Sequence, residues 1–123
     1  MKSYKDIAGD GGSDLLGQVT EHAARVQARM AAVKHVSAVM SGKGGVGKSS
    51  VTVHLASAFA QHGRAVGIVD ADVNGPSIAK MTGCRGQKVQ PGSTGMCPAI
   101  GAQNIKVMSM DLFLPEDDAP VMW

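Results

Sequence analysis

The chain has 123 residues, of which 44% are hydrophobic and 18% charged, and its formal net charge is +2. This length supports one modest hydrophobic core and no more than one domain. The small charge, with no stripe of Lys and Arg, argues against a nucleic-acid partner. Because no run approaches 18 apolar residues and the N-terminus lacks an apolar signal region, we expect neither a membrane partner nor secretion.

The two cysteines give no recognisable site. Cys84 and Cys97 lie in different settings with twelve residues between them. This spacing is typical of neither a disulfide framework nor a close-spaced metal pair. We therefore expect a reducing, cytoplasmic location and leave the roles of both thiols open.

The N-terminal part of the chain predicts a tail followed by a helix. Residues 1–12 are polar and rich in glycine, and we expect them to be a flexible tail. A helix is predicted over residues 13–34, with Ser13 suited to its N-cap. Its apolar stripe, spaced alternately by three and four, is Leu16, Val19, Ala23, Val26, Met30 and Val33. The repeat is too short for a coiled coil, so packing of the stripe against the rest of the chain is expected.

Short apolar runs and helical patterns then alternate. The β-branched run at 35–40 predicts a buried strand that leads into a glycine loop. Residues 49–63 predict a helix that ends with Gly63 at its C′ position. One face of this helix carries Val51, Leu55, Ala58 and Phe59. Residues 65–72 predict a second buried strand.

The second half of the chain continues the alternation less regularly. Residues 76–83 predict a short helix with Pro76 at its first position and Gly83 at its end. The loop-like region that follows allows a short strand at 88–90. A further strand is predicted within 104–113, alternating at Ile105, Val107 and Ser109. Strand, helix and strand in this order predict an α/β fold with a parallel sheet.

The segment SGKGGVGKSS at 41–50 carries the chemistry. Gly42, Gly47, Lys48 and Ser49 match G-x-x-x-x-G-K-[ST] between a predicted strand and a predicted helix. In such a loop, backbone N–H groups point at phosphate oxygens, and the helix N-terminus adds its dipole. Lys48 is expected to neutralise the β- and γ-phosphates, and the Ser49 hydroxyl to ligate Mg²⁺. The predicted nucleotide-binding residues are Gly42, Lys43, Gly44, Gly45, Val46, Gly47, Lys48, Ser49 and Ser50.

Two carboxylates follow the second predicted strand. Asp70 and Asp72 lie at its carboxyl end, where ligands bind in open α/β sheets. Alternation along the strand places both on the same side of the chain. Carboxylates there can hold water on Mg²⁺ or orient an attacking water, although they can also be solvated charges at a strand end.

These segments resemble a known family. KGGVGKSS is similar to the deviant Walker A motif, K-G-G-x-G-K-[ST], of the MinD/ParA superfamily of ATPases. DADVNGPSIAKMTG and NIKVMSMDLFLPEDDAPVMW resemble its Mrp/Nbp (ApbC) branch of iron–sulfur cluster carriers. The resemblance covers roughly residues 30–123. Gly75, Pro76 and Ser77 carry the assignment to this branch, because MinD-type and ParA-type relatives usually lack them.

The resemblance implies an incomplete P-loop NTPase fold of the SIMIBI class, with residues 35–123 as the N-terminal half of an ATPase domain. It also implies a homodimer in which two subunits enclose two ATP molecules. Lys43 would then reach the nucleotide of the partner subunit and stabilise charge in trans. By the same resemblance, Asp72 positions the attacking water and Asp70 supports the Mg²⁺ shell.

The function implied is that of an ATP-hydrolysing carrier or scaffold that assembles 4Fe–4S clusters and transfers them to apoproteins, together with assembly factors. The C-x-x-C pair that holds the cluster in this family lies beyond the segment that matches Trp123, so we expect no iron–sulfur ligands in this chain. Because the chain resembles only the first half of the domain, we also expect no ATPase activity from it alone. Two alternatives stay open: a positioning ATPase of the MinD/ParA kind, or a truncated nucleotide-binding fragment without turnover.

One position departs from the superfamily within the helix that follows the loop. His54 stands where asparagine is usual. We expect a partly buried histidine that makes a single hydrogen bond.

Overall fold

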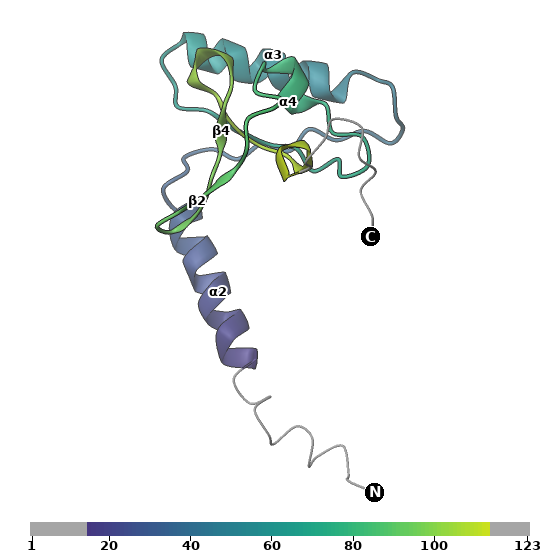
Figure 1. Ribbon diagram of the computed structural model, residues 1–123. Coiled ribbons are helices and arrows are strands. Elements are labelled where there is room, and N and C mark those ends of the chain that lie inside the picture. The colour runs from purple at the N-terminus through teal and green to yellow at the C-terminus, as the bar shows by residue number, and fades with distance from the viewer. Residues whose placement is uncertain (1–14, 114–123) are drawn as a thin grey trace, which may run out of the picture. The chain divides into compact units, whose positions relative to one another are not determined.

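A computed structural model describes residues 15–113 of the chain (Figure 1). The chain divides into two compact units, Met1–Ala38 and Val39–Trp123, which are described separately. The tail expected at 1–12 lies outside the described residues. Within them, no helix is both long and apolar enough to cross a bilayer.

In the first unit, the predicted N-terminal helix is confirmed over the helix α2 (Leu15–Met30) and ends four residues before the expected boundary. A turn at 31–32 follows it. Arg25 forms an ion pair with Glu21 one turn earlier, which gives α2 a modest local stabilisation. No residue of α2 is buried, so the packing of its apolar stripe stays a prediction.

The second unit contains two α-helices, five strands and two short 3₁₀ segments within its described residues. In chain order they are α3 (Lys48–Gln61), β1 (Gly67–Val69), α4 (Ile78–Met81), β2 (Gln90–Gly92), β3 (Gly95–Cys97), β4 (Ala99–Ile100), η2 (Ala102–Asn104), β5 (Lys106–Met108) and η3 (Met110–Phe113).

Three of the strands form one sheet, in the order β1-β5-β4. β1 and β5 are parallel, with Gly67 opposite Lys106 and Val69 opposite Met108, so the predicted parallel sheet is confirmed for this pair of strands. β4 runs antiparallel to β5, so the sheet is mixed. β2 and β3 form a separate antiparallel hairpin, whose first strand starts two residues later than the range that the sequence allowed.

The core of this unit lies between α3, α4 and the sheet. The predicted alternation on the last strand is confirmed, because Ile105, Val107 and Ser109 are all buried. The buried apolar residues are Ala56, Ile68, Ile78, Ala79, Cys84, Ala99, Ile105, Val107 and Leu112. This small core holds the carboxyl end of β1 and the turns around α4 in place.

The helix α3 buries a different face from the one that the sequence suggested. Its predicted apolar face is exposed, including Val51, Leu55 and Phe59. Instead, Ala56 is buried, and Val53 and Ala60 pack against the core. Small side chains on this second face let the helix approach the sheet closely, whereas no described residue covers the larger ones.

The strand predicted at 35–40 is not formed, and that prediction is wrong for the described structure. A strand needs a neighbour for its backbone N–H and C=O groups, and β1 occupies the edge of the sheet without pairing to this segment. The β-branched composition of 35–40 therefore has no pairing to support it. The second predicted strand is confirmed over Gly67–Val69 only.

The helix ends follow the glycine predictions closely. Gly63 and Gly83, each one residue past a helix C-cap, both have φ of 76°, a left-handed conformation that suits glycine. The short helix α4 begins at Ile78 with Ser77 as its N-cap, so Pro76 precedes the helix instead of opening it.

Candidate nucleotide-binding site

The glycine loop at 41–47 leads directly into α3, which begins at Lys48. Gly45 and Gly47 have φ of 72° and 92°, a left-handed backbone in which other residues are strained. A Cβ added at either position would meet no atom within 4 Å. The Ser41 hydroxyl donates a hydrogen bond of 2.7 Å to the carbonyl of Lys43, which fixes the first turn of the loop. The backbone of the loop is therefore open to a group that approaches closely.

The start of α3 is free of competing acceptors. Gly47 is its N-cap and makes no side-chain cap, and the first turn holds no acidic residue. The Val51 amide donates to the Gly47 carbonyl at 2.9 Å, so the three preceding N–H groups have no intrahelical acceptor. These N–H groups and the helix dipole together favour an anion at this end.

The predicted site residues of the loop are contiguous, and their side chains differ in exposure. Lys48, Ser49 and Ser50 are half-buried in the first turn of α3, whereas Lys43 is exposed. The Thr52 hydroxyl donates to the Lys48 carbonyl at 2.8 Å and holds this turn together. Lys48 is thus partly buried at the start of the helix, while Lys43 is exposed on the loop.

Asp70 organises the segment that follows β1. Its amide donates to the Met108 carbonyl at 2.9 Å, which extends the parallel pairing by one residue. Its Oδ2 accepts hydrogen bonds from the amides of Ser77 and Ile78, each at 3.1 Å, and its Oδ1 accepts one from the Asp72 amide at 3.1 Å. Asp70 therefore stabilises the start of α4 from seven and eight residues away, a role that the sequence analysis missed because nothing local marks it.

Asp72 is exposed and stabilises the tight turn after it. Its Oδ1 accepts hydrogen bonds from the amides of Asn74 and Gly75 at 3.2 and 3.0 Å. Its Oδ2 lies 4.0 Å from the Cβ position of Gly75. The two carboxylates are thus linked in series, since Asp70 holds the backbone of Asp72 and Asp72 holds the turn.

The loop and the aspartates belong to the same edge of the unit. The chain returns from the end of α3 to the start of β1 in a few residues, and α3 packs on β1. A helix that leads through a short turn into a strand and packs on it runs antiparallel to that strand, so the start of α3 lies toward the carboxyl end of β1. Within residues 15–113, no hydrogen bond or ion pair joins Lys43 or Lys48 to either aspartate.

These groups fit Mg²⁺ unequally. The Ser49 hydroxyl at the start of α3 is a suitable hard oxygen ligand beside phosphates. Both oxygens of Asp70 already accept backbone N–H groups, three bonds in all. These bonds favour a role for Asp70 in holding the loop, and its place in a magnesium shell stays a prediction.

Removing the Asp70 carboxylate is expected to destabilise the protein. Asp70→Ala leaves three backbone N–H groups without their acceptor, and we expect a loss of about 2–3 kcal/mol in the free energy of unfolding. Asp70→Asn keeps one acceptor oxygen and should lose less. Urea unfolding of the complete protein measures both values, and equal stability of Asp70→Ala and the unchanged protein would contradict this role.

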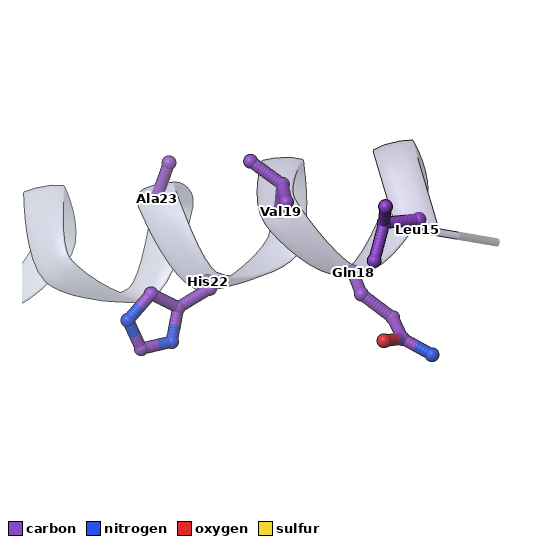
Figure 2. Close-up of a pocket in the computed structure, with 5 residues that line it drawn as sticks. All are labelled: Leu15, Gln18, Val19, His22 and Ala23. Carbon is purple, nitrogen blue, oxygen red and sulfur yellow. The ribbon is translucent and has the colours of Figure 1, made fainter.

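Other features of the described residues give weaker indications of a functional site. Figure 2 shows a shallow hollow on α2, where Val19 and Ala23 point to one side of the helix and Gln18 and His22 to the other. All of its lining residues are exposed. Cys84 is a buried free thiol and Cys97 an exposed one. No group of three or more His, Cys, Asp or Glu side chains within 15–113 is arranged to hold a metal ion.

Comparison with known proteins identifies the family. The family model described as NUBPL iron-transfer P-loop NTPase, within ParA, matches residues 32–123. The chain belongs to this family of P-loop NTPases. It is 52% identical over 99 residues to an iron–sulfur cluster carrier protein of Saccharolobus solfataricus, covering 80% of this chain and 33% of the relative. A cytosolic Fe-S cluster assembly factor, NBP35, of Eremothecium gossypii is 42% identical over 101 residues, covering 81% of this chain and 30% of the relative.

A solved structure of a family relative supports the fold. It is a nucleotide-binding protein from Archaeoglobus fulgidus in complex with ADP, with a TM-score of 0.58 and 49% sequence identity. The match covers 60% of this chain and 31% of that protein. The chain spans about a third of the length of the iron–sulfur cluster carrier and the assembly factor that it matches. The predicted P-loop fold and the resemblance to iron–sulfur carriers are thereby confirmed.

Proposed function

We propose that this chain is the nucleotide-binding part of an ATP-hydrolysing carrier that assembles 4Fe–4S clusters and transfers them to apoproteins. The observation that carries the proposal is the open glycine loop beside an uncapped helix start. Left-handed Gly45 and Gly47 bring the backbone close to a ligand, and the first N–H groups of α3 have no acceptor of their own. Such a site recognises phosphate oxygens.

The side chains divide the work of hydrolysis. Lys48 supplies positive charge to the β- and γ-phosphates. The hydroxyls of Ser49 and Ser50, at the start of α3, bind the same ligand: that of Ser49 through Mg²⁺ and that of Ser50 by a hydrogen bond. Mg²⁺, held by Ser49 and the phosphates, would neutralise charge on the transferred phosphoryl group. Asp72 orients the attacking water, and Lys43, exposed on the loop, reaches the nucleotide of a second subunit. The working unit is therefore a homodimer.

The cargo and the partners follow from the family. The iron–sulfur carrier names of the Saccharolobus and Eremothecium relatives support a cluster as the substrate that is carried, and apoproteins and assembly factors as partners. The name of the Eremothecium protein also supports a cytoplasmic location. We assign the ligands of the cluster to residues outside this chain, because neither Cys84 nor Cys97 belongs to a paired motif.

Loss of the loop lysine tests the proposal. In the complete protein, Lys48→Ala should weaken ATP binding by a factor of about 10 to 100, because a charge-assisted contact with phosphate is lost. Isothermal titration calorimetry measures the affinity. Lys88→Ala, at an exposed position away from the loop, is the matched control and should bind ATP normally. Unchanged affinity in Lys48→Ala would show that the loop is not a working nucleotide site.

A further inference from the structure

The one hydrogen bond between side chains at the start of α3 joins Ser50 to His54. Ser50 Oγ and His54 Nδ1 are 3.5 Å apart, one helical turn from each other. Ser50 is half-buried and His54 is exposed. The neighbouring hydroxyls of Ser41 and Thr52 instead donate hydrogen bonds to backbone carbonyls. The Ser50 hydroxyl therefore differs from its neighbours, because its partner can act either as a donor or as an acceptor.

The Ser50 hydroxyl has a single proton, and this limits which of Ser50 and His54 can donate in their hydrogen bond. Ser50 donates either to His54 or to another acceptor, but it cannot do both. A phosphate oxygen without a proton can only accept, so a phosphate that contacts the Ser50 hydroxyl requires Ser50 to donate to it. Ser50 Oγ must then accept from His54, and His54 must carry its proton on Nδ1. A bound phosphate thus selects one state of the imidazole, and the two linked hydrogen bonds strengthen each other.

We propose that His54 is a positioning residue for the nucleotide: its Nδ1–H directs the Ser50 hydroxyl toward a phosphate oxygen. This inference rests on the proposed nucleotide site and assigns to that site a residue outside the glycine loop. His62, at the other end of the same helix, offers an internal contrast. Its Nδ1 lies 2.7 Å from the carbonyl of Ala58, an acceptor that fixes the proton on Nδ1 regardless of ligand.

The test measures MgADP binding to the complete protein by calorimetry. His54→Leu should weaken binding about fivefold, the value of one hydrogen bond, because leucine cannot donate. His54→Asn should bind within about twofold of the unchanged protein, since its amide N–H₂ can replace the Nδ1–H donor. In a Ser50→Ala background, His54→Leu should cause no further loss. His62→Leu is the matched control and should leave the affinity unchanged.

A spectroscopic readout separates positioning from a general effect on the helix. In ¹⁵N-labelled protein, MgADP should move His54 toward the Nδ1-protonated form and leave His62 as it was. Normal affinity of His54→Leu, an equal loss with and without Ser50, or an unchanged His54 ring would overturn the inference. Lys48→Ala, measured in parallel, distinguishes a failure of the role of His54 from a failure of the nucleotide site. If it weakens binding while His54→Leu does not, only the role of His54 fails; if it has no effect, the nucleotide site fails too.

Discussion

Replacing Lys43 with alanine is expected to reduce ATP turnover by at least a factor of about 10³ while leaving nucleotide binding nearly intact. Lys43 is exposed, and within the described residues it forms no ion pair. Only its backbone carbonyl is held, by the Ser41 hydroxyl. Its side chain is therefore available to a second subunit, where it would stabilise charge that develops on the transferred phosphoryl group. Single-turnover hydrolysis and calorimetry on the complete protein separate the two effects.

Mixed dimers test whether Lys43 acts in trans. Subunits that carry Lys43→Ala keep Asp72, and subunits that carry Asp72→Ala keep Lys43. An equal mixture should recover about a quarter of normal turnover, because half of the dimers are mixed and each has one competent site. Dimers in which every subunit carries both changes have no competent site and should show no turnover. Normal turnover by Lys43→Ala alone would contradict the role of this lysine.

The polypeptide of residues 1–123 on its own is expected to be aggregation-prone, without measurable ATPase activity. The large apolar side chains of α3 are exposed, 55% for Val51 and 51% for Phe59, and Val69 at the sheet edge is 77% exposed. β1 also presents an edge that no described strand pairs. Exposed apolar surface beside an open strand edge favours association between chains. Light scattering, dye binding and calorimetry should show aggregation and no cooperative transition.

Polar substitutions on α3 sharpen this prediction. Leu55→Gln with Phe59→Ser should reduce aggregation of residues 1–123. In the complete protein the same changes should lower the free energy of unfolding by at least about 2 kcal/mol, if this face is covered there. Gln61→Glu, at an exposed polar position on the same helix, should alter neither property. A sharp two-state melt of residues 1–123, with a midpoint raised by ATP, would contradict the prediction.

The sequence by itself determined the glycine loop, the helix that follows it and the strand that precedes Asp70. These features depend on local chemistry. Glycine alone adopts left-handed φ without strain, as at Gly45 and Gly47, and a helix after the loop needs only its own backbone hydrogen bonds. The alternation of Ile105 and Val107 likewise identified the buried face of β5.

Tertiary structure decided what depends on a distant partner. The segment 35–40 has the composition of a strand but forms none, because a strand exists only where a neighbour accepts its backbone hydrogen bonds. The buried face of α3 is formed by residues such as Ala56, because a small side chain lets the helix approach the sheet closely. Asp70 was correctly placed at the end of a strand, yet its contacts with Ser77 and Ile78 arise only when the chain folds back on itself.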